Sequence, residues 1–225
     1  MLSKQIAYYR ARAAEYDDWF YRRGRYDRGL ELNTQWYCEV ETLKNEVGSL
    51  GNCERILEMA CGTGIWTYEL AKISETVDAL DASPEMLDLA CQRVPAPHVR
   101  YHLADLFDYE PEREYDLVFM AFWLSHVPPG CLDGFLKVVR GCLRPGGRLF
   151  IIDSLFDQTS SARNHQLADA SQSVQTRKLR DGREFQVVKV FYDPNALKEQ
   201  LEKLQFECKV NETGRYFFAI NAGLV

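Results

Sequence analysis

Blocks of apolar residues alternate with amphipathic segments along the chain, which predicts strands and helices in turn. The apolar run at residues 56–60 predicts a strand that ends in a glycine turn. Residues 77–80 predict a second strand that ends at Asp81, and a third strand begins at His98. The nearly unbroken apolar segment 115–122 is typical of a central strand that is buried on both faces of a sheet.

Capping residues predict where two helices begin. Ser83 is suited to an N-cap and Pro84 to the first helical position, so a helix is expected from there to Arg93. Asp193 and Pro194 repeat this arrangement near the C-terminus. The apolar residues expected to face inward from that second helix are Leu197, Leu201 and Leu204.

A third helix is predicted over residues 131–143, because apolar residues recur there at helical spacing. Its buried stripe is expected to comprise Leu132, Phe135, Leu136, Val139 and Leu143. Pro145 and Gly146 are expected to end this helix and force a turn before a strand at 148–153.

Composition favours one α/β domain. The chain has 225 residues, of which 46% are hydrophobic, enough to bury a full core. The net charge of −6 argues against binding of nucleic acid. No apolar run reaches the ~20 residues of a membrane span, and no signal peptide is evident, so we expect a soluble cytoplasmic protein, as a monomer or homodimer. The seven cysteines lack zinc-site spacing, and we expect reduced thiols and no metal.

The glycine turn at Gly62 and Gly64 has the features of a ligand site, because glycine allows positive φ and close approach to the main chain. Asp81 follows Gly62 by 19 residues, the spacing at which a carboxylate accepts hydrogen bonds from a ribose diol. A dinucleotide site has a third glycine, but Thr67 stands there, preceded by Trp66. The turn therefore indicates an adenosine-type ligand without a pyrophosphate.

The pattern E-x-x-x-G-x-G, formed by Glu58, Gly62 and Gly64, resembles the first motif of class I S-adenosylmethionine-dependent methyltransferases. The segments YYRARAAEYDDW, LEMACGTGIWT, LDASPEML, FWLSHVPP and LRPGGRLFIIDS are similar to those of a bacterial-type subgroup that acts on small molecules. This resemblance implies a Rossmann-like α/β fold. Its seven-stranded sheet has the order 3-2-1-4-5-7-6, with strand 7 antiparallel and helices on both faces.

The resemblance also implies a single methyltransferase domain over residues 1–225. It consists of an N-terminal helical lid (1–50), a cofactor-binding core (51–154), a substrate-side insertion (155–182) and C-terminal strands 6 and 7 (183–225). Alternating residues at 185–192 are expected to form strand 6, and the segments around 212–214 to complete strand 7.

S-adenosylmethionine is the cofactor that the resemblance implies. Glu58 is expected to order the turn, Asp81 to bind the ribose, and Asp105 with Leu106 to meet the adenine. The full set of expected cofactor-binding residues is Tyr9, Arg12, Tyr16, Glu58, Ala60, Gly62, Gly64, Trp66, Asp81, Ala82, Met86, Asp105, Leu106, Phe107, Ala121 and Phe122.

Two variable segments are candidates for contact with the acceptor. Tyr9, Arg12 and Tyr16 share one helical face and are expected to close a lid on the cofactor carboxylate, although such spacing also suits ordinary packing. Basic residues in the insertion indicate either an anionic acceptor or a solvated loop. The candidate acceptor-binding residues are Tyr8, Trp19, Trp123, His165 and Arg177.

His126 follows the fourth strand, at the edge where ligands of such sheets bind. It is the candidate catalytic base, or else a structural histidine bonded to a neighbouring loop. The expected function is in-line methyl transfer to O, N or C of a small metabolite, mainly by proximity and exclusion of water. The alternative is a non-catalytic S-adenosylmethionine-binding sensor or partner subunit.

Overall fold

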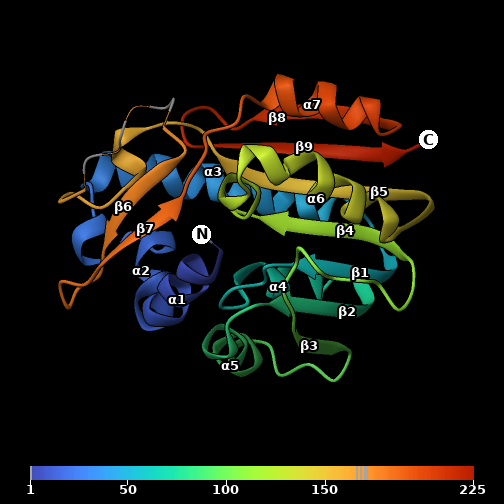
Figure 1. Cartoon of the computed structure of the whole chain (residues 1–225), viewed down its shortest axis with the longest axis horizontal. Helices are drawn as coiled ribbons and strands as arrows, with labels where there is room; N and C mark the ends of the chain where they lie inside the picture. Colours follow the sequence, from blue (N-terminus) through green and yellow to red (C-terminus); the bar gives the residue numbers. More distant parts are fainter. Residues whose placement is uncertain (1, 166, 168, 170–171) are drawn as a thin grey trace.

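The computed structural model describes residues 2–165, 167, 169 and 172–225. Its centre is a seven-stranded sheet with the order β3-β2-β1-β4-β5-β9-β8 (Figure 1). The strands of this sheet are β1 (Cys53–Met59), β2 (Ser74–Asp81), β3 (Val99–Leu103), β4 (Tyr115–Ala121), β5 (Leu143–Ser154), β8 (Phe206–Glu212) and β9 (Phe217–Leu224). Strands β1 to β5 pair in parallel, and β9 is antiparallel to both of its neighbours. The fold predicted from the sequence is confirmed.

Helices cover both faces of the sheet. On one face lie α3 (Leu30–Gly48), α4 (Ile65–Leu70) and α5 (Pro84–Arg93), and on the other lie α6 (Pro129–Gly141) and α7 (Pro194–Lys203) (Figure 1). Residues 117 and 119 of β4 pack into the first of these cores, and residues 118 and 120 into the second. This double burial explains why the sequence of β4 is almost continuously apolar.

Sequence reading located the starts of α5 and α7 correctly. The Ser83 side chain accepts a hydrogen bond from the amide of Met86, and the Asp193 carboxylate accepts from the amides of Asn195 and Ala196. The predicted end of α6 was wrong. The helix ends at Gly141, and β5 begins at residue 143, because Leu143 already pairs with Tyr115 on β4. Pro145 and Gly146 therefore lie in an irregular part of β5, where the register jumps before pairing resumes at Arg148.

The prediction that residues 185–192 form strand 6 was also wrong. Residues 184–188 form β7 (Glu184–Val188), which pairs only with β6 (Val174–Lys178) in a separate antiparallel hairpin. The sixth and seventh strands of the main sheet are β8 and β9 instead. Alternation along a strand indicates that one face is covered, but not by which partner. Residues 166, 168, 170 and 171 of the expected insertion lie outside the described residues.

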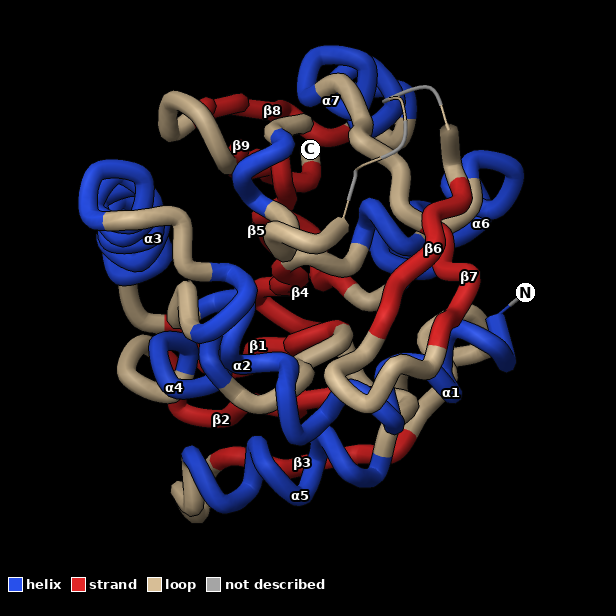
Figure 2. Tube along the Cα trace, turned by 90° about the vertical axis from the view of Figure 1, so that its left-hand side faces the viewer, coloured by secondary structure: helices blue, strands red, loops and turns tan. Residues whose placement is uncertain are grey.

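The N-terminal segment lies against this hairpin, beyond the carboxyl ends of the parallel strands (Figure 2). It consists of α1 (Leu2–Arg12), a short turn at Ala13–Glu15, and α2 (Tyr16–Phe20). The buried ring of Tyr8 packs on Leu179 and Val187 of the hairpin region. The side chain of Gln5 donates to the carbonyl of His126 and accepts from the amide of Val188. Two segments far apart in sequence thus close over one edge of the sheet.

Within the described ranges, no helix is both long and apolar enough to cross a membrane.

Candidate functional site

The turn after β1 brings the backbone to the edge of the sheet in an unusual conformation. Ala60, Gly62 and Gly64 all have positive φ angles, of 59°, 56° and 80°. A Cβ atom at Gly64 would lie 2.9 Å from Cα of Ala90, so only glycine allows α4 to start this close to α5. At Gly62, by contrast, a Cβ would meet only a ring carbon of Tyr16 at 4.0 Å. The backbone at Gly62 is therefore open to a ligand.

Asp81 ends β2 beside this turn and holds it. One carboxylate oxygen accepts from the amide of Gly62 and the other from the amide of Ser83, each at 2.9 Å. Burial raises the pKa of Asp81 to about 6 despite these hydrogen bonds. The carboxylate therefore faces a poorly hydrated cavity, and each of its oxygens keeps a lone pair for a further donor.

The turn opens into a cavity between the sheet edge, the N-terminal segment and the β6–β7 hairpin. Most residues that the sequence nominates for the cofactor line it: Tyr9, Arg12, Tyr16, Ala60, Gly62, Asp81, Ala82, Met86, Asp105, Leu106, Phe107, Ala121 and Phe122.

Three residues nominated for the cofactor do not line this cavity. Glu58 is buried beneath the turn, where its carboxyl group accepts a hydrogen bond from the Thr67 hydroxyl at 2.6 Å. Trp66 is buried against the rings of Phe20 and Phe119, and Gly64 lies against α5. These three residues therefore stabilise the turn from behind and do not face the cavity.

All candidate acceptor-binding residues line the same cavity, and so does His126. These residues are Tyr8, Trp19, Trp123, His165 and Arg177. Sequence reading missed a further set of lining residues: Gln5, Ile6, Tyr26, Ser83, Ser154, Ser160, Ser161, Leu167, Val187, Lys189 and Phe191. The aromatic and basic content of the N-terminal segment could have indicated Tyr26. Lys189 and Phe191 follow β7 and line the cavity because β7 lies in the separate hairpin. The sequence had instead predicted this segment as strand 6 of the main sheet.

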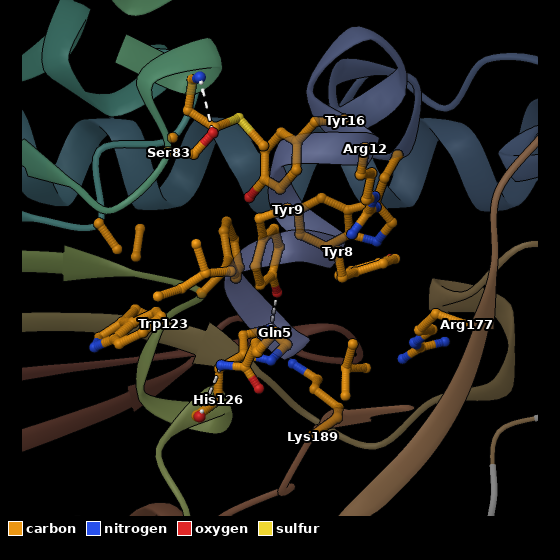
Figure 3. Close-up of a pocket in the computed structure, with 18 of the residues that line it drawn as sticks. Gln5, Tyr8, Tyr9, Arg12, Tyr16, Ser83, Trp123, His126, Arg177 and Lys189 are labelled. Carbon is orange, nitrogen blue, oxygen red and sulfur yellow. Dashed lines mark hydrogen bonds between the residues drawn. The ribbon is translucent and has the colours of Figure 1, made fainter. Parts of the chain in front are cut away.

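His126 and Tyr9 form a hydrogen-bonded pair in the cavity wall (Figure 3). The Tyr9 hydroxyl lies 2.7 Å from Nε2 of His126, and Nδ1 lies 2.5 Å from the carbonyl oxygen of Val188. Because that carbonyl can only accept, Nδ1 carries the proton, and Nε2 accepts from Tyr9. Both ring nitrogens are therefore occupied.

Positive charge dominates the part of the cavity around the hairpin. Burial and the nearby charge of Lys189 lower the pKa of His126 well below 6.5. Burial and Arg177 lower the pKa of His165 to about 4. Both histidines are consequently neutral at pH 7, and the charge in this region comes from Arg12, Arg177 and Lys189.

Side-chain contacts hold the N-terminal segment to the rest of the protein on both sides of the cavity. Arg10 on α1 forms an exposed ion pair with Glu85 on α5. On the other side, the indole nitrogen of Trp19 donates to the carbonyl of Ser160 at 2.9 Å. The Trp19 ring also packs edge-on against Phe122, with ring centroids 4.9 Å apart. The cavity is thus covered from β2 across to β5.

Comparison with known proteins agrees with this geometry. A family model described as a methyltransferase domain matches residues 56–147. A demethylmenaquinone methyltransferase from Tropheryma whipplei is 33% identical over 103 residues, which is 44% of this chain and 41% of the relative. A malonyl-[acyl-carrier protein] O-methyltransferase from Serratia marcescens is 33% identical over 132 residues, which is 57% of this chain and 47% of the relative. The chain spans less than half the length of these curated relatives.

Solved structures extend the similarity over nearly the whole chain. The complex of DhpI with SAM and HEP is 33% identical and has a TM-score of 0.78, covering 99% of this chain and 97% of DhpI. The complex of DhpI with SAH gives 32% identity and a TM-score of 0.77, covering 99% of this chain and 96% of DhpI. Taken with the glycine turn and the strand order, this full-length match shows that the chain belongs to the class I S-adenosylmethionine-dependent methyltransferases.

Proposed function

We propose that the protein transfers a methyl group from S-adenosylmethionine to a small-molecule acceptor inside the covered cavity. The observation that carries this proposal is that the glycine turn, Asp81 and the Tyr9–His126 pair all line one enclosed space. The lining of the cavity extends from the glycine turn to the β6–β7 hairpin, so side chains beyond the cofactor residues can contact an acceptor. The negatively charged chain also favours a free metabolite over nucleic acid.

The residues around the turn fit the proposed cofactor. The open backbone at Gly62 suits its amino-acid tail, and the buried carboxylate of Asp81 suits a ribose diol. Asp105 and Leu106 line the cavity beyond β3, where an adenine amino group and ring face would meet an acceptor and an apolar surface. When bound, S-adenosylmethionine supplies an electrophilic methyl group on its sulfonium sulfur.

The chain itself contributes orientation and exclusion of water. Tyr16 and Trp19 of the N-terminal segment and Phe122 after β4 form an aromatic wall over the turn. Holding two reactants in such a space can replace a bimolecular encounter, with effective molarities of roughly 10⁵ M or more. We infer that the N-terminal segment is a lid, and that it opens to admit the ligands.

The Tyr9–His126 pair is the proposed proton acceptor. Because Nε2 of His126 is occupied by the Tyr9 hydroxyl, the acceptor's proton passes to the tyrosine oxygen while the tyrosine's own proton passes to His126. The lowered pKa of His126 leaves the ring neutral at pH 7, so Nε2 carries no proton of its own when the tyrosine proton arrives. Tyr9 thereby takes a role beside His126, in place of the cofactor contact expected from its helical spacing.

Replacing Tyr9 with phenylalanine is expected to lower kcat about tenfold, because the relay to His126 loses its first oxygen. The Kd of S-adenosylmethionine should stay within about twofold. Since burial keeps the pKa of His126 well below 6.5, wild-type kcat should be flat from pH 6.5 to 9. Tyr192→Phe is the matched control, because its hydroxyl donates to Val127 at 2.8 Å outside the cavity. If Tyr9→Phe and wild type have equal kcat values, the Tyr9–His126 pair does not accept the proton, and the protein acts only by orienting the two reactants.

Release of S-adenosylhomocysteine tests the proposed function. The purified protein is incubated with S-adenosylmethionine and separate panels of phenols, amines, carboxylic acids and phosphorylated metabolites. Methyl transfer is supported if S-adenosylhomocysteine forms with one panel of acceptors and does not form when the acceptor is left out. Tight cofactor binding without turnover on any panel would instead favour the non-catalytic sensor or partner subunit.

A further inference from the structure

Arg177 on β6 has no carboxylate partner among the residues that the structure describes, although it lines the cavity and is only partly exposed. Its one hydrogen bond to a described residue runs from Nη1 to the hydroxyl oxygen of Ser161 at 3.0 Å. Within the ranges that the structure describes, no carboxylate oxygen lies within 4.0 Å of its guanidinium. A partly buried cation without a counter-ion is costly unless a ligand supplies the opposite charge.

Other basic residues around the hairpin are paired. Lys178 pairs with Glu184, and Arg183 with Asp181. Arg180 pairs with Asp18, and Arg25 with Glu15. Two of the four Arg and Lys residues of the insertion, Lys178 and Arg180, are thus compensated.

Lys189, which also lines the cavity, is compensated as well. Its ammonium lies 3.5 Å from Asp153 and donates to Ser125 at 2.8 Å. The uncompensated positive charge near the hairpin therefore comes from Arg177 and Arg12.

The two arginines lie on either side of Tyr8 in Figure 3. The Arg12 guanidinium stacks on the ring of Tyr16, 5.0 Å from its centroid, and Tyr16 lies beside Gly62 in the glycine turn. Arg177 lies on the hairpin beside Ser161, on the far side of Tyr8 in Figure 3. Arg12 is thus placed for the carboxylate of the cofactor's amino-acid tail, and Arg177 is left for another anion.

Neutral side chains with donor hydrogens line the same cavity as Arg177. The hydroxyl of Ser161 accepts from Arg177, and the hydroxyl of Tyr26 is within 3.4 Å of both Arg12 and Arg25, so each hydroxyl keeps its own proton to donate. Nε2 of His165 accepts from the amide of Lys178, which leaves the proton of the neutral ring on Nδ1. One cation and several hydroxyl or ring donors make a set suited to an oxyanion.

We propose that Arg177, Ser161 and Tyr26 bind an anionic oxygen group of the methyl acceptor, a phosphoryl or carboxylate group. This inference rests on the proposed function and names its substrate class. The anionic group anchors the acceptor at the hairpin end, with the methyl-accepting atom directed toward the glycine turn. Positive charge at Arg177 also selects against neutral and cationic metabolites.

Calorimetry with inorganic phosphate and with malonate, at constant ionic strength in chloride, tests the anion site without turnover. We expect wild type to bind one probe or both, and Arg177→Gln to weaken that binding at least tenfold. Arg100→Gln is the matched control, because Arg100 is exposed on β3 at the far edge of the sheet. The affinity of each protein for S-adenosylhomocysteine is measured in parallel. It should fall for Arg12→Gln and stay unchanged for Arg177→Gln.

The outcomes separate this proposal from the proposed function. Loss of S-adenosylhomocysteine binding in Arg177→Gln, with Arg12→Gln unaffected, would reassign Arg177 to the cofactor and overturn the anion site. Absence of phosphate and malonate binding in wild type, together with turnover of an uncharged acceptor, would overturn it and leave methyl transfer intact. If Arg177→Gln does not fold, the wild-type protein is treated with phenylglyoxal, which modifies arginine side chains. Mass spectrometry then measures the rate of modification at Arg177, which should be slower when phosphate or malonate is present. Unchanged reaction would count against the site.

Discussion

Replacing Asp81 with alanine is expected to raise the Kd of S-adenosylhomocysteine about 100-fold. Two hydrogen bonds from a ribose diol to a buried carboxylate are lost, and bonds to charged groups contribute about 1.5–3 kcal/mol each. The substitution also frees the amides of Gly62 and Ser83, which Asp81 holds at 2.9 Å, so the turn loses its support. Calorimetry with S-adenosylhomocysteine measures the change, and Asp88→Ala on the exposed side of α5 is the control.

The pH dependence of binding gives the same prediction a second readout. Burial raises the pKa of Asp81 to about 6 in the free protein. A ribose diol prefers the ionised carboxylate, so affinity should be full above pH 7 and should fall, by up to about tenfold per pH unit, below pH 6. Asp81→Asn should bind weakly and without this slope between pH 5 and 7. A wild-type affinity that is flat over this range would remove Asp81 from the ribose site.

Local patterns in the sequence, with the family resemblance that they carry, were sufficient to predict the fold and the part of the cavity around the glycine turn. The glycine turn, the carboxylate at the end of β2 and the cap at Ser83 are encoded within a few residues of one another, where spacing alone fixes geometry. The continuous apolar run of β4 likewise shows by itself that this strand is buried on both faces. Such features need no knowledge of distant contacts.

The part of the cavity around the β6–β7 hairpin could be predicted only in part, because segments far apart in the sequence form it. Strand β7 alternates like any half-buried strand, and only its pairing with β6 excludes it from the main sheet. The position of Lys189 in the cavity follows from that pairing. Similarly, the spacing of Tyr9 on α1 indicated one face of a helix, but the contact with His126 lies 117 residues away in the chain. The residue types in these segments indicated a binding site, but the sequence did not show which residues would contact one another.

Glu58 should make the protein less stable as pH rises from 6 to 9, and Glu58→Gln should remove this effect. Burial raises the pKa of Glu58 to about 8 in the folded state, against an ordinary value of 4.5. Between these values the folded protein keeps a proton that the unfolded chain has lost, so raising the pH favours unfolding. From pH 6 to pH 8 the free energy of unfolding should fall by about 2 to 3 kcal/mol more in wild type than in Glu58→Gln.

Urea unfolding at pH 6, 7, 8 and 9 measures this difference. The glutamine amide can still accept the hydrogen bond from Thr67, so the two proteins should approach equal stability only as the pH falls toward 4.5, and Glu58→Gln should be the more stable protein from pH 6 upward. Glu69→Gln is the control, because Glu69 pairs with Lys72 at the surface. Parallel pH profiles for wild type and Glu58→Gln would mean that Glu58 is already ionised beneath the turn. A difference that widens from pH 6 to 8 and levels off by pH 9 would instead mean that a neutral carboxylic acid supports the glycine turn at neutral pH. Asp81 would then carry the only negative charge of this pair.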